Sequence, residues 1–198
     1  MKLLFLDFET YYDDAYSLRK LTPPQYILDK RFECIMCSVI EDGGTPYIVD
    51  GPNFPTWIAQ FDPSQTTVIC YNALFDCAIL AWRYGFIPVK TVDVLGMVRS
   101  LCGHLLPSAS LGGAAKTLGL GEKLGTLVKV KGLNRQGIID AGLWEEFTAY
   151  ALQDVVLCHK IFFSLNHAMS ASERRVMDMV LRCAIEPKFV LEDRKSVV

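Results

Sequence analysis

The sequence predicts an α/β domain in which helices cover a mixed sheet, and three observations support this prediction. The 198 residues are 51% hydrophobic and 21% charged, a composition that supplies a full core for one domain. Short apolar runs typical of strands alternate with segments of helical spacing. Their order is three strands, a helix, a strand, a helix, a strand and then helices, which is typical of a layered α/β protein.

The first half of the chain is predicted to supply most of the sheet. Residues 3–6 form a continuous apolar run, which fits a strand buried on both faces. Residues 34–40 and 47–49 complete an antiparallel meander with short connections. Residues 11–33 are mixed and polar around Pro23-Pro24, so we expect a surface excursion there. The remaining elements are a short helix at 54–61, a strand at 66–71 and a helix at 74–84 that ends at Gly85.

The second half is predicted to be mainly helical. After a strand at 91–94, helices are expected from about 94 to 101, at 110–118, at 143–165 and at 172–185. Residues 143–165 form the clearest helix, because their apolar residues recur every three or four positions. Ser172 is the expected N-cap of the last helix, and Pro187 is its expected end. Residues 119–137 lack such spacing and are predicted to be a long, partly ordered loop.

Length, charge and cysteine content limit the number of domains, the class of binding partner and the cellular compartment. We expect one domain over residues 1–190 and a short charged tail at 191–198. The net charge of −2 argues, on its own, against a nucleic-acid-binding protein. There is no signal-peptide pattern and no apolar stretch long enough to span a membrane. We therefore expect a cytoplasmic protein without membrane contact, in which the seven cysteines are reduced thiols. Their odd number also counts against a complete disulfide framework.

Four acidic residues and one tyrosine form the candidate site. Asp7 and Glu9 close the first strand and share a face, because strand residues i and i+2 do. Asp76 interrupts an apolar segment early in a helix, and Tyr150 and Asp154 share a helix face at i and i+4. Each residue alone also fits an ordinary role at a strand end, in a first helical turn or at a helix edge. Together the acids are oxygen ligands of the kind that Mg²⁺ or Mn²⁺ prefers.

Three segments resemble the motifs of a known family. They are, in order, Asp7-Phe8-Glu9-Thr10, Asn72-x-x-Phe75-Asp76 and Tyr150-x-x-x-Asp154. The set resembles the three exonuclease motifs of the DEDD superfamily of 3′–5′ exonucleases, and the tyrosine is typical of its DEDDy branch. The segment from Tyr12 to Glu33, Leu118-Gly119-Leu120 and the residues from Trp144 also resemble the N-terminal part of phage family A DNA polymerases. The resemblance covers about residues 1–190.

The resemblance implies a fold and a metal site. The fold is the RNase H-like fold of DnaQ-like exonucleases, a mixed five-stranded sheet flanked by helices, with its first three strands antiparallel. Two divalent metal ions, Mg²⁺ or Mn²⁺, are implied, with Asp7, Glu9, Asp76 and Asp154 as ligands and Tyr150 orienting the attacking water.

The resemblance also implies a substrate. Nucleoside monophosphates would be released from the 3′ end of single-stranded or frayed DNA, as in proofreading for a phage-type DNA polymerase. Thr10, Asn72 and Phe75 would contact the terminal nucleotide. These 198 residues include no polymerase region, so an excised domain and a free-standing exonuclease are both open, and a polymerase domain or subunit is a candidate partner. An RNA 3′ exonuclease and a non-catalytic nucleic-acid-binding module of the same fold are the alternatives.

A basic segment alters the meaning of the net charge. Residues 116–136 carry Lys116, Lys123, Lys129, Lys131 and Arg135 against the single acid Glu122. A flexible basic loop can follow a phosphate backbone, so Lys129 and Lys131 are candidates for substrate binding, with a solvated loop as the alternative.

Two other groups of chemically active residues fit structural roles better. Cys34-x-x-Cys37 lies in an apolar strand without a second pair of ligands, so buried thiols are expected there instead of zinc. His159 is five residues beyond Asp154 and points away from it around the helix, so we expect an exposed structural histidine.

Overall fold

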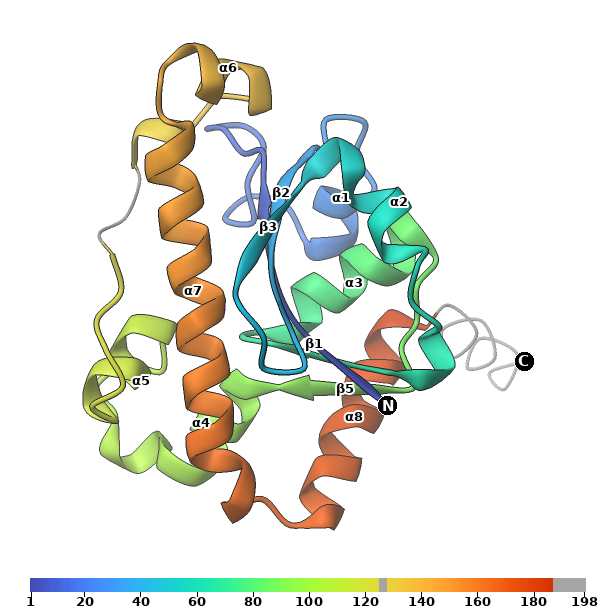
Figure 1. Ribbon diagram of the computed structural model, residues 1–198, viewed down its shortest axis with the longest axis vertical. Coiled ribbons are helices and arrows are strands. Elements are labelled where there is room, and N and C mark those ends of the chain that lie inside the picture. The colour runs from blue at the N-terminus through green and yellow to red at the C-terminus, as the bar shows by residue number, and fades with distance from the viewer. Residues whose placement is uncertain (125–127, 187–198) are drawn as a thin grey trace.

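A mixed sheet of five strands forms the centre of the protein (Figure 1). The computed structural model describes residues 1–124 and 128–186. The strands are β1 (Lys2–Thr10), β2 (Cys34–Glu41), β3 (Tyr47–Asp50), β4 (Thr66–Cys70) and β5 (Lys90–Asp93). They lie in the order β3-β2-β1-β4-β5, antiparallel from β3 to β1 and parallel from β1 to β5. The predicted mixed sheet, with its first three strands antiparallel, is confirmed.

The central strand β1 decides which face each candidate residue occupies. Leu4, Phe5 and Leu6 have no exposed surface, as predicted for a strand covered on both faces. Leu4 and Leu6 belong to one hydrophobic cluster and Phe5 to another, because alternate side chains point to opposite faces. Asp7 and Glu9 continue the alternation of Phe5, so they point towards the same side of the sheet as Phe5.

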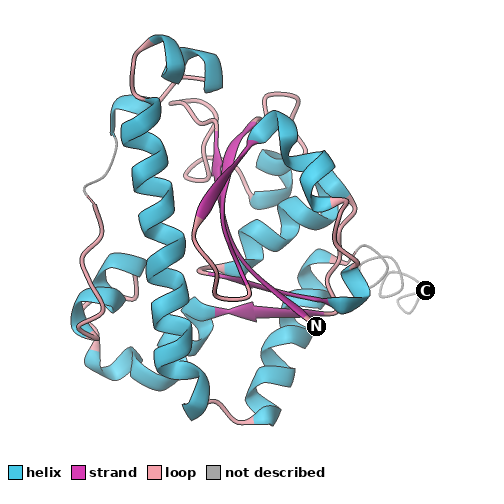
Figure 2. Ribbon diagram, viewed as in Figure 1, coloured by secondary structure: helices cyan, strands magenta, loops and turns pink. Residues whose placement is uncertain are grey.

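Helices cover both faces of the sheet (Figure 2). The face of Leu4 and Leu6 packs against α1 (Pro23–Ile27), α2 (Phe54–Ile58), α3 (Ala73–Tyr84) and α8 (Ala171–Ile185). The face of Phe5 packs against α4 (Val94–Cys102), α5 (Leu111–Thr117) and α7 (Trp144–Leu165). A smaller cluster joins α6 (Arg135–Asp140) to the start of α7 and to β2. Short 3₁₀ turns lie at Gly51–Asn53, Pro63–Gln65, Gly103–Leu105, Val128–Val130 and Asn166–Ala168.

The prediction that residues 11–33 are a surface excursion is wrong for three of their side chains, although Leu18 and Leu28 are exposed as expected. Tyr16 and Ile27 have no exposed surface, and Tyr26 is also buried. The rings of Tyr16 and Tyr26 stack with their centroids 4.3 Å apart, and the Tyr16 hydroxyl donates to the Tyr26 carbonyl at 2.6 Å. The prediction missed these buried residues because the segment is polar overall and they have no regular spacing in the sequence.

The predicted long loop at 119–137 contains the start of an unpredicted helix. The side chain of Asn134 accepts a hydrogen bond from the N–H of Gly137 at 2.8 Å and so caps α6. Ile138, the one buried residue of α6, anchors this helix in the core. A single apolar anchor is too little to give a visible helical period, which explains why the prediction missed it.

The N-cap of the last helix lies two residues earlier than predicted. Ser170, and not Ser172, is the N-cap, because its hydroxyl accepts the N–H of Glu173 at 3.2 Å while the Glu173 carboxylate accepts the N–H of Ser170 at 2.8 Å. Pro187 and the predicted tail at 191–198 lie outside the described residues. Within the described part of the chain, no helix is both long and apolar enough to cross a membrane.

Candidate active site

Three of the predicted acidic residues meet between β1 and α7. Asp7 and Glu9 come from β1, and Asp154 comes from the middle of α7, which crosses that face of the sheet (Figure 1). One carboxylate oxygen from each residue lies within 4.8 Å of the other two. We call Asp7, Glu9 and Asp154 the carboxylate cluster. The spacing is short enough for one cation to contact all three residues.

Asp76 approaches the cluster from the other side of β1. It lies in the first turn of α3, is 3% exposed, and its Oδ1 accepts the backbone N–H of Phe8 at 3.0 Å. Phe8 is the residue between Asp7 and Glu9, so this bond fixes the Asp76 carboxylate beside them. The structure therefore gathers all four predicted acids around the end of β1, with Asp76 outside the closest set of three.

Asp93 holds the helix that carries Asp76. Its Oδ1 accepts three backbone N–H groups, those of Asn72, Ala73 and Leu95, each at 3.1 Å. The first two belong to the start of α3 and the third to the start of α4. Asn72 sits in the left-handed region with φ +66°, which brings its N–H onto Asp93. The prediction did not include Asp93, although an aspartate directly before a helical segment is a recognisable N-cap signal.

Burial and mutual repulsion disfavour the charged forms of these carboxyls. Burial, reinforced by the charge of Asp154, raises the pKa of Asp7 to about 7. Burial followed by the charge of Asp7 raises the pKa of Glu9 and that of Asp76 well above their usual range. Burial also raises the pKa of Asp154, against the opposing effect of Lys123. Such a group of acids is stabilised by a cation placed among them.

Lys123 lies at the carboxylate cluster, a position that the sequence did not predict. Its Nζ lies 2.5 Å from Asp154 Oδ2 and 4.7 Å from the centre of the Tyr150 ring. The sequence places Lys123 among the basic residues of a loop, 31 positions from Asp154, so only the folded chain reveals the contact. Asp154 Oδ1 is buried and has no hydrogen-bond partner among the described residues.

Tyr150 lies one turn before Asp154 on α7, as its spacing predicts. Its side chain is half-buried, and burial raises the pKa of the phenol to about 12. Tyr150 is therefore protonated at neutral pH and presents a hydroxyl that can donate a hydrogen bond.

The predicted substrate-binding residues are brought together only in part. Thr10, Phe75 and Lys131 line one pocket of about 660 Å³ that also reaches Glu9, and we call it the Thr10 cleft. Arg19 and Lys20, which the prediction did not include, line it as well. Asn72 is exposed at the start of α3, and Lys129 forms an ion pair with Glu146 at 3.4 Å; neither of them lines this pocket.

In the folded chain, the positive charges of the basic segment, residues 116–136, are paired with carboxylates. Each of its five basic residues has a carboxylate partner: Lys116 with Glu122, Lys123 with Asp154, Lys129 with Glu146, Lys131 with Asp14, and Arg135 with Asp50. Most of these pairs are exposed, and exposed pairs are weak enough for a phosphate to compete with them.

His159 and the cysteines take no part in the site. His159 is half-buried, with its ring centre 4.7 Å from those of Phe5 and Phe163, so the prediction of an exposed histidine is wrong. Burial lowers its pKa. All seven cysteines are free, with Cys37 buried and Cys34 half-buried. In the described part of the chain, neither of them joins a group of possible metal ligands.

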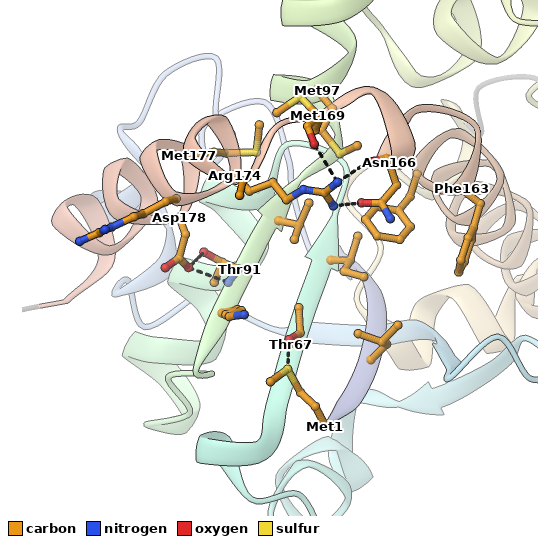
Figure 3. Close-up of a pocket in the computed structure, with 17 residues that line it drawn as sticks. Met1, Thr67, Thr91, Met97, Phe163, Asn166, Met169, Arg174, Met177 and Asp178 are labelled. Atoms are coloured by element: carbon orange, nitrogen blue, oxygen red, sulfur yellow. Dashed lines mark hydrogen bonds between the residues drawn. The ribbon is translucent and has the colours of Figure 1, made fainter.

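A second pocket, of about 690 Å³, lies between α8 and the strands β4 and β5 (Figure 3). Its lining includes Met1, Met97, Met169 and Met177, so we call it the methionine pocket. Arg174 donates hydrogen bonds to the side chain of Asn166 and to the carbonyl of Met169. None of the predicted site residues lines this pocket.

Comparison with known proteins identifies the fold. No family model and no curated protein matches the chain. Brucella melitensis NrnC with bound Mg²⁺ is similar at TM-score 0.60 and 16% sequence identity, over 98% of this chain and 85% of that one. Trypanosoma brucei RNase D in complex with RNA U12 is similar at TM-score 0.63 and 13% identity, over 94% of this chain and 63% of that one. The family B DNA polymerase of Pyrobaculum calidifontis is similar at TM-score 0.59 and 17% identity, over 84% of this chain and 24% of that one.

At 13 to 17% sequence identity, the likeness of these structures to this chain is a likeness of fold. Their similarity confirms the RNase H-like fold of DnaQ-like exonucleases that the motifs imply. The finer likeness to phage family A polymerases rests on the sequence motifs alone.

Proposed function

We propose that residues 1–190 form a divalent-metal-dependent 3′–5′ exonuclease that releases nucleoside monophosphates from single-stranded or frayed DNA ends. The observation that carries this proposal is the meeting of Asp7, Glu9 and Asp154 within 4.8 Å, with Asp76 fixed beside them. A module that only bound nucleic acid would gain nothing from buried, mutually repelling carboxylates.

The carboxylate cluster fits a divalent cation. Asp7, Glu9 and Asp154 would hold it. The buried Oδ1 of Asp154 has no hydrogen-bond partner among the described residues and is a ligand atom suited to that role. We place Asp76 in the same ligand set, for two ions of Mg²⁺ or Mn²⁺. When bound, such ions lower the pKa of a water and offset the charge that develops on the phosphate.

The surrounding residues position the reacting groups. In this mechanism the hydroxyl of Tyr150 orients the attacking water, while Thr10 and Phe75 hold the terminal nucleotide in the Thr10 cleft. Lys131, Arg19 and Lys20 lie where they can contact phosphates further along the strand. The water oxygen bonds to phosphorus as the bond from phosphorus to the 3′ oxygen of the preceding nucleotide breaks. That oxygen takes a proton, and a nucleoside 5′-monophosphate leaves.

Proofreading for a phage-type DNA polymerase is the biological role we propose, with a polymerase domain or subunit as partner. It rests on the resemblance of the motifs to phage family A enzymes. Seven free thiols fit the reducing cytoplasm of a bacterium or a phage-infected host. RNA is the second candidate substrate, because Trypanosoma brucei RNase D, which has a similar fold, is in complex with RNA U12.

A degradation assay tests the proposal. DNA and RNA strands of one sequence, labelled at the 5′ end, are incubated with Mg²⁺, Mn²⁺ or EDTA. We expect stepwise shortening from the 3′ end that requires metal and is faster on DNA. Faster shortening of RNA would make RNA the substrate, and inactivity on both strands with either metal would contradict the proposed activity. Asp140→Asn, which changes an exposed acid of α6, is the matched control for Asp7→Asn and Asp154→Asn.

A further inference from the structure

We propose that Lys123 is an internal counter-ion of the carboxylate cluster, and that a divalent metal ion must displace its ammonium group in order to bind. The inference rests on the proposed function, because it concerns the same site. It adds a step before catalysis, in which a metal ion from solution replaces the Lys123 ammonium group at the carboxylate cluster.

The contacts of Lys123 differ from those of the other basic residues in its segment. Its ammonium group lies 2.5 Å from Asp154 Oδ2 and faces the Tyr150 ring, and its charge also acts on Asp7 and Glu9. The Asp154 side chain is 6% exposed, whereas both members of the Lys116–Glu122 pair are more than 70% exposed. Lys123 alone in the segment therefore contacts a buried carboxylate, where charge interactions are strong.

The backbone around Lys123 is fixed against α7. Gln153 donates to the carbonyl of Glu122 at 3.0 Å, and Lys160 donates to the carbonyl of Leu120 at 3.2 Å. Gly121, with φ +138°, packs so closely that an added Cβ would lie 3.3 Å from Leu157 Cδ2. Three positions of α7 thus hold the segment, so the approach of Lys123 to Asp154 is built into the fold.

The geometry of the site implies that the Lys123 ammonium group and a metal ion compete for the carboxylate cluster. Asp154 Oδ2 is engaged by the ammonium group, and a metal ion held by Asp7, Glu9 and Asp154 would share the Asp154 carboxylate with it. Two cations so close together repel strongly in a buried site. The flexible lysine side chain can swing outwards while the segment stays attached to α7.

Chemical labelling of lysines tests the displacement directly. The full chain is acetylated by an amine-reactive ester at constant pH, with and without saturating Mg²⁺, and the labelled peptides are quantified by mass spectrometry. We expect Lys123 labelling to rise at least threefold with metal while Lys116 labelling stays constant. Asp154→Asn should expose Lys123 to the reagent without metal. If calorimetry shows Mg²⁺ binding but Lys123 labelling does not change, the inference is overturned and the proposed function stands.

Metal affinity gives a second, independent test. Lys123→Met keeps the apolar stem and removes the charge, so calorimetry should show Mn²⁺ binding about tenfold tighter than in the wild type. Lys116→Met, the same change in an exposed pair, should leave the affinity within twofold. Equal affinities in wild type and Lys123→Met would overturn the inference. Absence of Mn²⁺ binding from both would overturn the proposed metal site itself.

Discussion

The carboxylate cluster, which adjoins the Thr10 cleft through Glu9, and the methionine pocket differ in whether their carboxylate oxygens have hydrogen-bond partners. The volumes of the Thr10 cleft and the methionine pocket are similar, about 660 and 690 Å³. In the methionine pocket, Asp178 accepts from the N–H and hydroxyl of Thr91 and from Arg182. In the cluster, Asp154 leaves one buried oxygen without a partner among the described residues, and burial works against the charge of Asp7. Pocket size therefore does not distinguish the two regions, but the unpartnered Asp154 oxygen among crowded carboxyls does. An unpartnered buried atom is not sufficient alone, because His159 Nε2 is another one among the described residues.

Neutralising one acid of the carboxylate cluster should have the largest effect on hydrolysis, and so give the clearest difference from changes in the methionine pocket. Asp7→Asn should lower the hydrolysis rate about 10³-fold, because several kcal/mol of charge stabilisation in the transition state is lost with a metal ligand. Steady-state rates on a single-stranded substrate measure the effect. A loss below tenfold would contradict the role of Asp7.

Tyr150→Phe should have the next largest effect. We expect hydrolysis to slow about 10- to 100-fold, because the water loses the hydroxyl that orients it. Calorimetry should show unchanged metal binding, since the phenol is not a proposed ligand. An unaffected rate would remove Tyr150 from the mechanism.

Asp178→Asn is the matching change in the methionine pocket. It should lower the free energy of unfolding by about 1–3 kcal/mol, because the donors of Thr91 and Arg182 lose a charged acceptor. Denaturant unfolding measures this loss. Hydrolysis at a temperature where the variant is folded should stay within twofold of wild type, and a large loss would mean that the two regions are coupled.

Replacing Lys129 and Lys131 together by alanine should act more weakly, on substrate binding alone. Affinity for single-stranded DNA should fall several-fold, and the slope of log affinity against log salt should decrease by about 1, since up to two phosphate contacts are lost. An unchanged salt slope would remove these lysines from the binding surface.

The smallest expected effect is the pH response of His159. Burial holds its pKa below the usual 6.5, so the folded state binds its proton less readily than the unfolded state does. The contribution of His159 to the free energy of unfolding should therefore be fully present above about pH 6.5. It should be lost as the pH drops through the pKa of His159 in the folded state. His159→Phe should show a smaller decrease in melting temperature from pH 7 to pH 5. An equal decrease would exclude this histidine as a cause.

The sequence predicts the strands well, and also the common face of Asp7 and Glu9, because both depend on local patterns. The apolar run at Leu4 to Leu6 and the i, i+2 spacing of Asp7 and Glu9 are visible without any tertiary contact. Lys123 could not be placed in this way, since Asp154 lies 31 positions away. The bond of Asp93 to Leu95 has a local N-cap signal, but its bonds to the start of α3 span 20 and 21 positions. The buried Tyr16 shows the same limit, because its stacking on Tyr26 follows no helical or strand period.

The single oxygen of Asp93 that accepts three N–H groups has a consequence for tolerance to mutation. Because one atom joins the starts of α3 and α4, a change there would transmit an error in position to Asp76, although Asp93 lies outside the carboxylate cluster. A screen for inactive but folded variants would therefore return Asp93 together with the acids of the site. Such a result would identify Asp93 as a residue that positions Asp76, and not as a fifth metal ligand.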